Sequence, residues 1–198
     1  MRVAGLYAIT AQHTTLADIE QALTGGVQCL QYRYKQRVGA PDPSVVAALC
    51  RRYRATFIIN DDVALAHDVA ADGVHLGRDD PALGEARARL GNRAIIGVSC
   101  YNDVRRAVHA AAAGADYVAF GRFFPSSTKP KALTAPINVL SEARAQVAVP
   151  IIAIGGITPE NAHPLLAAGA DALAVIDGLF GQADIAAAAR RYRTLFDD

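Results

Sequence analysis

The residues of this chain that are best suited to chemistry directly follow short apolar segments. They are cations, carboxylates, an amide, an imidazole, hydroxyls and glycines: Arg33, Lys35, Asn60, Asp61, Asp62, His75, Gly77, Asp79, Asp80, Ser99, Ser126, Ser127, Thr128, Lys129, Gly155, Gly156, Asp177 and Gly178. A fold in which the apolar segments end at one rim would gather these side chains into a single site.

Two carboxylates and three cations in this set suit a magnesium-bound diphosphate. Asp61 and Asp80 offer hard oxygen ligands, and Mg²⁺ typically binds one or two carboxylates together with substrate phosphate oxygens. Arg33, Lys35 and Lys129 would neutralise the remaining phosphate charge, and an arginine can hold two oxygens at once. We therefore expect Mg²⁺ and a diphosphate leaving group, whose developing charge the metal and the cations would stabilise.

Neutral donors and a glycine pair indicate further phosphate contacts. Asn60, Ser126 and Thr128 add uncharged donors to the same site. The glycines at 155–156 precede a Thr-Pro pair at 158–159, which is typical of a helix start. Because backbone N–H groups at a helix N-terminus bind phosphate, we expect a second phosphate site after the seventh strand.

Several of these residues also fit purely structural roles. Asp61 or Asp62 could cap the helix that follows, and Asp80, which precedes a proline, is an equally good cap. His75 could be packed inside a strand instead of touching a ligand. Three aspartates at strand entrances are expected to be structural: Asp72, Asp116 and Asp171.

Strands and helices that alternate along the chain must position the site. Strands are expected at 3–9, 27–33, 56–60, 73–76, 94–98, 116–121, 150–155 and 171–176, and helices at 15–24, 43–53, 62–71, 81–90, 102–113, 137–147, 159–168 and 184–196. Strands that are apolar on both faces belong in parallel sheets. Eight such units predict one α/β domain, residues 1–198, folded as a (β/α)8 TIM barrel, while periodicity alone leaves an open doubly wound sheet as an alternative.

Capping signals and a weak internal repeat support this division. Helix starts are expected at 42–43, 80–81, 102–103 and 158–159, and left-handed glycines that end helices at 114 and 169. Similar segments at 70–74, 114–118 and 169–173 each join a helix end to a strand. The segment 122–136 is longer than a barrel turn requires, which is typical of a functional loop.

Composition restricts the classes of partner and compartment. The chain has 198 residues, 52% hydrophobic and 20% charged, with a formal charge of +1, so it can bury a core and carries no basic stripe for nucleic acid. No apolar run is long enough for a membrane span, and no signal peptide is visible. Cys29, Cys50 and Cys100 suit reduced thiols in a cytoplasmic protein. The oligomeric state stays open, with a homodimer as one candidate.

Taken in order, the segments around the candidate residues resemble the thiamine phosphate synthase family over essentially the whole chain. They are LYAIT at 6–10, QYRYK at 31–35, INDD at 59–62, GVHLG at 73–77 with Asp80, GVS at 97–99, DYVAFGRFFPSSTKP at 116–130, IAIGGITPEN at 152–161 and AVIDGLF at 174–180. The resemblance implies a transferase that condenses a hydroxymethylpyrimidine diphosphate with a thiazole phosphate, using Mg²⁺, to give thiamine phosphate and pyrophosphate.

The resemblance also implies roles for the matching residues. The diphosphate would be held by Arg33, Lys35, Asn60 and Lys129, and Mg²⁺ by Asp61 and Asp80. Ser99, beside the reacting diphosphate, and Lys129 are the implied catalytic residues. Gly156 and the backbone at Ile176 would hold the thiazole phosphate, with Thr128 beside it. Gln31, His75, Ser126 and Asp177 complete the implied substrate-binding set. The pyrimidine would leave as a cation-like intermediate, so no strong general base is required.

Three positions depart from the commoner family pattern. Tyr34 stands where an acidic residue often separates the Arg and the Lys, and Ser126 replaces a usual Thr. Asp177 stands where a Ser is common, and a carboxylate beside a phosphate is unfavourable unless it turns away. This departure concerns the thiazole half of the site and leaves the pyrophosphate half unaffected.

Three other functions stay open from the sequence. They are a thiazole tautomerase-like isomerase on the same barrel, a non-catalytic barrel that binds phosphate ligands, and a phosphosugar isomerase. An isomerase needs an acid–base residue but not the magnesium and diphosphate set. Metal-dependent turnover would distinguish an enzyme from a binding protein.

Overall fold

The computed structural model describes residues 3–77, 82–125 and 134–197. Parallel strands in these residues form a closed barrel in sequence order, with the last strand paired to the first. They are β1 (Gly5–Ile9), β2 (Cys29–Tyr32), β3 (Thr56–Asn60), β4 (Gly73–Leu76), β5 (Ile95–Tyr101), β6 (Tyr117–Gly121), β7 (Ile151–Ile154) and β8 (Ala172–Val175). The predicted (β/α)8 barrel is confirmed, and the open sheet is excluded.

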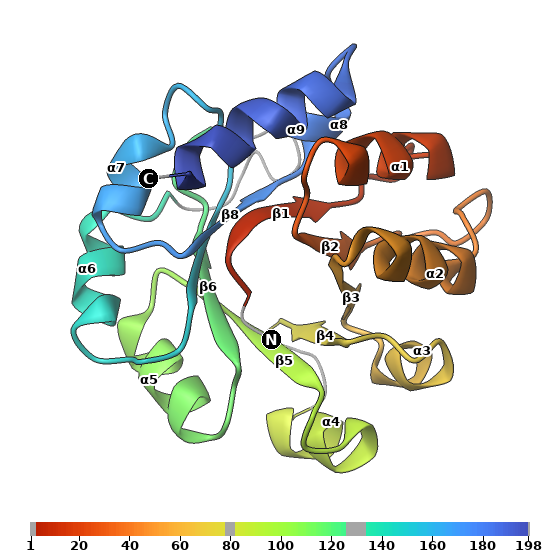
Figure 1. Ribbon diagram of the computed structural model, residues 1–198. Coiled ribbons are helices and arrows are strands. Elements are labelled where there is room, and N and C mark those ends of the chain that lie inside the picture. The colour runs from red at the N-terminus through yellow and green to blue at the C-terminus, as the bar shows by residue number, and fades with distance from the viewer. Residues whose placement is uncertain (1–2, 78–81, 126–133, 198) are drawn as a thin grey trace.

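Helices surround the barrel, as Figure 1 shows in a view along the barrel axis. They are α1 (Leu16–Thr24), α2 (Pro43–Tyr53), α3 (Val63–Asp68), α4 (Leu83–Leu90), α5 (Val104–Ala112), α6 (Asn138–Arg144), α7 (His163–Ala167), α8 (Asp177–Phe180) and α9 (Ile185–Arg193), followed by the 3-10 turn η1 (Thr194–Phe196). In the described part of the chain, no helix is both long enough and apolar enough to cross a bilayer.

Side-chain caps set the starts of several helices. Asp42 and Asp103 accept backbone N–H groups from the first turns of α2 and α5, so the predicted starts at 42–43 and 102–103 are confirmed. Gly114 and Gly169 follow the ends of α5 and α7 with φ of 94° and 105°, which a residue with a Cβ rarely adopts. Both helices therefore end where the sequence predicted.

The chain departs from the predicted elements after β7 and β8. Helix α7 begins at His163, not at the predicted Thr-Pro pair, because the Asn161 side chain closes a turn there. Its Oδ1 accepts the Thr158 N–H at 2.8 Å, and its Nδ2 donates to the Gly156 carbonyl at 3.0 Å. The short helix α8 was not predicted, because four residues are too few to show helical periodicity.

Two apolar layers form the core. Along β1 the side chains alternate, so Leu6 and Ala8 pack outward beneath the helices, while Tyr7 and Ile9 join a separate cluster inside the barrel. A barrel of eight strands has an interior just wide enough for side chains to fill it. The inner cluster therefore makes a packed floor below the carboxyl ends of the strands.

A repeated pair of hydrogen bonds joins the strands two by two at their amino ends. At the entrance of each even-numbered strand, one residue makes two hydrogen bonds to one residue of the preceding strand. Its backbone N–H donates to the carbonyl of that partner, and its side chain accepts the N–H of the same partner. The pairs, with the two distances in that order, are Gln28 with Leu6 (3.1 and 3.1 Å), Asp72 with Phe57 (2.9 and 2.8 Å), Asp116 with Ile96 (2.8 and 2.8 Å) and Asp171 with Ile151 (2.8 and 2.7 Å). We call these four pairs the entrance clamps; they account for the Asp of each repeated sequence segment.

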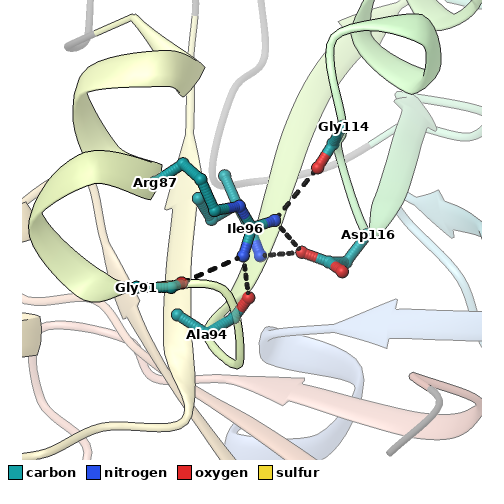
Figure 2. Close-up of polar contacts among 6 residues, drawn as sticks. All are labelled: Arg87, Gly91, Ala94, Ile96, Gly114 and Asp116. Atoms are coloured by element: carbon teal, nitrogen blue, oxygen red, sulfur yellow. Dashed lines mark hydrogen bonds and ion pairs between the residues drawn. The ribbon is translucent and has the colours of Figure 1, made fainter.

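Arginines from the outer helices close over two of the entrance clamps. Arg87 of α4 donates from Nη2 to the Asp116 carboxylate at 2.6 Å and to the Gly114 carbonyl at 3.0 Å (Figure 2). Arg144 of α6 pairs with Asp171. Each arginine ties its helix to the amino-terminal rim and balances the charge of the clamp carboxylate, so the predicted structural role of these aspartates is confirmed.

Candidate active site

A cavity of about 380 Å³ opens at the carboxyl ends of the strands. Every strand of the barrel, or the segment that follows it, contributes to the lining. The predicted site residues that line it are Gln31, Arg33, Asn60, His75, Ser99, Gly156, Ile176 and Asp177. Parallel strands in a closed barrel place all of their carboxyl ends on one face, which is why residues far apart in the sequence meet here.

A second pocket of about 280 Å³ contains Lys35. It shares Arg33, Ile176 and Asp177 with the main cavity, so the two hollows adjoin at this rim. Lys35 is exposed, and Arg33 and Asp177 are half-buried. The Asp177 carboxylate, which the sequence marks as unfavourable for a phosphate site, lies in a pocket that is also lined by two cations, Arg33 and Lys35.

The end of β3 separates the roles of two neighbouring aspartates. Asp62 is the N-cap of α3, since its Oδ1 accepts the Leu65 N–H at 2.8 Å, and its Oδ2 pairs with Arg37 at 2.5 Å. Asp61 is exposed, has a positive φ of 64° and accepts a hydrogen bond from the Asn60 amide. Such a backbone is strained for a non-glycine residue, and strain of this kind concentrates at functional sites. The cap is therefore Asp62, which leaves the Asp61 carboxylate at the rim.

The donor set at the end of β3 fits a magnesium ion. The Asp61 carboxylate is a hard, exposed oxygen ligand next to Asn60, which lines the cavity. A magnesium site needs only one or two carboxylates in addition to phosphate and water oxygens. The second expected ligand, Asp80, lies outside the described residues, as do Ser126, Thr128 and Lys129. Across residues 3–77, 82–125 and 134–197, no group of three or more His, Cys, Asp or Glu side chains could hold a metal ion.

The glycine pair after β7 is required by a close approach of the chain. A Cβ on Gly156, which has φ of 64°, would lie 2.2 Å from the Pro125 carbonyl oxygen, and the Phe124 N–H donates to the Gly155 carbonyl at 3.0 Å. The predicted helix start directly after this turn is wrong, because α7 begins only at His163. A phosphate contact from this segment would therefore come from the turn and not from a helix, and the two glycines of the turn line the cavity.

A continuous chain of hydrogen bonds crosses the barrel interior beneath the cavity. Gln31 Nε2 donates to the Tyr7 hydroxyl at 2.9 Å, and this hydroxyl lies 2.8 Å from that of Tyr117. The Tyr117 hydroxyl is 2.9 Å from His75 Nδ1, and His75 Nε2 is 2.8 Å from Ser99 Oγ. We call these five side chains the interior polar chain. His75 is therefore packed within the barrel, as one expectation had it, and it also lines the cavity, so contact with a ligand stays a prediction.

Burial extends the pH range over which the two tyrosines of the interior polar chain stay protonated. Tyr7 and Tyr117 are 1% and 0% exposed. Loss of hydration raises the pKa of each phenol well above its ordinary value, because the charged form is disfavoured away from water. Each tyrosine thus retains one hydrogen to donate at neutral pH.

Sequence reasoning missed several residues that line the cavity, among them Tyr7, Tyr117 and Arg122. Tyr7 and Tyr117 were assigned to apolar strands, although a buried tyrosine hydroxyl usually has a hydrogen-bond partner, which was the available signal. Arg122 directly follows β6 and lines the cavity. The rule that selected Arg33 after β2 would also have selected Arg122, but it was grouped with the long segment 122–136.

Three comparisons with known proteins point to the same family. A family model described as thiamine monophosphate synthase matches residues 6–179. The chain is 49% identical over 202 residues to the thiamine-phosphate synthase of Nitrosococcus oceani, covering 98% of this chain and 93% of that protein. It is 51% identical over 206 residues to the thiamine-phosphate synthase of Azoarcus sp., covering 98% of each. Among solved structures, thiamine phosphate pyrophosphorylase from Pyrococcus furiosus matches with a TM-score of 0.87 and 32% identity, covering 97% and 95% of the two chains.

Proposed function

Because this chain belongs to the thiamine monophosphate synthase family, it is a transferase that makes thiamine phosphate, and we propose that the cavity at the barrel mouth is its active site. In this reaction the bond between the pyrimidine methylene carbon and the diphosphate oxygen breaks, and its electron pair leaves with pyrophosphate. The thiazole nitrogen then donates its lone pair to the methylene carbon. The isomerase and binding-barrel alternatives gain no support from the similar proteins.

The convergence of Arg33, Asn60 and Ser99 on one cavity carries this proposal. A cation, an amide and a hydroxyl at the ends of three strands share the wall of this cavity, and Arg33 also lines the adjoining pocket that contains Lys35. Donors held in place before the bond breaks stabilise the charge that develops on the leaving diphosphate without having to reorganise. We assign Arg33, Lys35, Asn60 and Lys129 to the diphosphate, and Ser99 and Lys129 to the transfer step itself.

Magnesium is the proposed cofactor, and Asp61 and Asp80 would hold it. When bound, it would supply positive charge to the leaving pyrophosphate. The chain contributes an exposed Asp61 carboxylate, whose backbone N–H donates to the His75 carbonyl at 2.9 Å. This bond ties the proposed metal ligand to β4, the strand that leads to Asp80.

The thiazole phosphate would bind where β7 and β8 end at the cavity. We assign it to the Gly156 turn and the backbone at Ile176, with Ser126 and Thr128 beside it. Gln31 and His75, which are buried polar residues of the lining, would contact the pyrimidine. Asp177 shares its pocket with Arg33 and Lys35, so its negative charge is offset there and need not repel a bound phosphate.

The compartment is proposed from the cysteines. Cys29, Cys50 and Cys100 are all buried and free of disulfides. Unpaired thiols are typical of a reducing compartment, and we propose that the enzyme works in the cytoplasm.

Pyrophosphate release tests the proposed site. Purified protein with both substrates should release pyrophosphate and thiamine phosphate in equal amounts, only when magnesium is present. Arg33→Gln should lower kcat/KM for the diphosphate about tenfold to a hundredfold, the range expected for a lost hydrogen bond to a charged group. Arg52→Gln is a matched control, because Arg52 lies on α2 with its side chain 73% exposed.

Two results would contradict the proposal. If both substrates bind without any release, the cavity is a binding site and not a catalytic one. If Arg33→Gln turns over like Arg52→Gln, then Arg33 does not hold the diphosphate.

A further inference from the structure

We propose that Tyr7, Tyr117 and His75 are positioning residues that fix the direction of the Ser99 hydroxyl, so that it donates its hydrogen into the cavity. This inference rests on the proposed role of Ser99 in the transfer step. None of the three need exchange a proton with the substrate. Their role is to keep one hydrogen bond donor ready before the diphosphate begins to leave.

The Gln31 end of the interior polar chain sets the direction in which each of its members donates a hydrogen bond. An amide nitrogen can only donate, so the Tyr7 oxygen accepts from Gln31 Nε2 and its own hydrogen goes to Tyr117. Tyr117 then donates to His75 Nδ1. A neutral imidazole with Nδ1 as acceptor carries its hydrogen on Nε2. His75 Nε2 therefore donates to Ser99 Oγ, and the Ser99 hydrogen is left for a ligand.

The reverse direction is less favourable. If Tyr117 donated to Tyr7, the Tyr7 oxygen would accept two hydrogen bonds, and its own hydrogen would have to turn to the neighbouring Cys29 thiol. Sulfur is a weak acceptor, and a buried donor without a good acceptor costs about 1–3 kcal/mol. The reverse direction would also direct the Ser99 hydrogen at His75 and away from the cavity.

The packing of the barrel holds the interior polar chain rigidly. The rings of Tyr7 and Tyr117 meet edge to face with centroids 6.0 Å apart, and the His75 ring stacks on Tyr117 at 5.6 Å. Gly97 makes room for this arrangement, because a Cβ there would lie 1.9 Å from the Tyr117 ring. Since both phenols stay protonated at neutral pH, the direction of donation persists under working conditions.

A double-mutant cycle tests the proposal. Tyr117→Phe keeps the ring and removes the hydroxyl, so His75 loses the donor that defines its tautomer. We expect kcat to fall about tenfold, which corresponds to about 1.4 kcal/mol of transition-state stabilisation, with little change in either KM. In the Ser99→Ala background, the same substitution should change kcat less than twofold, because it acts through the Ser99 hydroxyl.

The outcomes separate this proposal from the proposed function. If Ser99→Ala alone leaves kcat unchanged, the role of Ser99 in the transfer is wrong, and so is the role of the tyrosines. If Ser99→Ala lowers kcat but Tyr117→Phe does not, or if the two effects multiply, the active site stands and the positioning role is refuted.

The tautomer of His75 gives a second readout, which a merely structural role would not change. In protein labelled with ¹⁵N at histidine, the His75 signals should show Nδ1 as acceptor and Nε2 as protonated, and His75→Gln would assign them. Tyr117→Phe should shift both signals toward a mixture of tautomers. Tyr53→Phe is the matched control: it removes a hydroxyl that bonds Glu20 on the outer helices, and it should change neither kcat nor these signals. Unchanged His75 signals in Tyr117→Phe would overturn the proposal.

Discussion

Replacing Asp116 with alanine should destabilise the barrel while leaving its chemistry intact. The Asp116 carboxylate accepts the N–H of Ile96 at 2.8 Å and pairs with Arg87 at 2.6 Å (Figure 2). Ile96 is 0% exposed, so its buried N–H would lose this acceptor once the carboxylate is removed. All of these contacts lie at the amino-terminal rim, opposite the proposed active site.

The loss of stability in Asp116→Ala has two contributions, the unpaired backbone N–H of Ile96 and the broken ion pair with Arg87. A buried N–H without an acceptor costs about 1–3 kcal/mol. The ion pair adds about 0.2–1 kcal/mol, because its side chains are 21% and 42% exposed and solvent screens them. The free energy of unfolding should therefore fall by about 1–4 kcal/mol. With a urea m value of about 2–3 kcal/mol/M, the midpoint should fall by about 1 M.

Urea unfolding followed by far-UV circular dichroism would measure this loss, with kcat measured on the folded variant. Asp116→Asn is the matched control: it keeps an oxygen for the Ile96 N–H and loses only the charge, so it should cost less than about 1 kcal/mol. An alanine variant as stable as the native chain would refute the reasoning. Equal losses for alanine and asparagine would show that charge matters more than the backbone hydrogen bond.

Two further predictions concern the end of β3 and the buried phenols. Asp61→Ala should lower magnesium-dependent turnover at least tenfold without lowering Tm, whereas Asp62→Ala should cost about 1 kcal/mol of stability through the lost cap and leave turnover unchanged. Because burial raises the pKa of Tyr7 and Tyr117, the unfolded chain loses these protons above about pH 10 while the folded chain keeps them. Stability should therefore fall as pH rises beyond that point, and urea midpoints for Tyr7→Phe should show a shallower fall.

The sequence was sufficient for the barrel because each unit carries its own local signals. Asp42 before Pro43 and Gly114 after an alanine-rich run set element boundaries through local backbone chemistry. Thr158 before Pro159 gave the same signal and was wrong, because the Asn161 side chain satisfied the Thr158 N–H in a turn. A capping signal predicts a helix only when no neighbouring side chain competes for the same backbone groups.

The site was predictable where strands end in charged or polar residues, and less so inside the barrel. Arg33, Asn60 and Ser99 follow from topology alone, since every parallel strand ends on the same face. The choice of Asp62 over Asp61 as the cap depends on backbone dihedrals that two adjacent aspartates do not reveal. The contact between Tyr7 and Tyr117 spans 110 positions in the sequence, and pairing across the barrel is not encoded in either strand's pattern.

The entrance clamps group the eight strands into four pairs, and each pair is one continuous segment of the chain. Every clamp joins an odd-numbered strand to the even-numbered strand that follows it, so both partners lie within one β–α–β segment of the chain. A circular permutant opened after α2, α4 or α6 would keep each clamp within a single continuous segment. One opened after α1, α3, α5 or α7 would place the two halves of a clamp at opposite ends of the polypeptide. The connections that follow α2, α4 and α6 are therefore the places where this chain should best tolerate new termini. Segments of two strands cut at these connections are the natural modules for building a chimeric barrel.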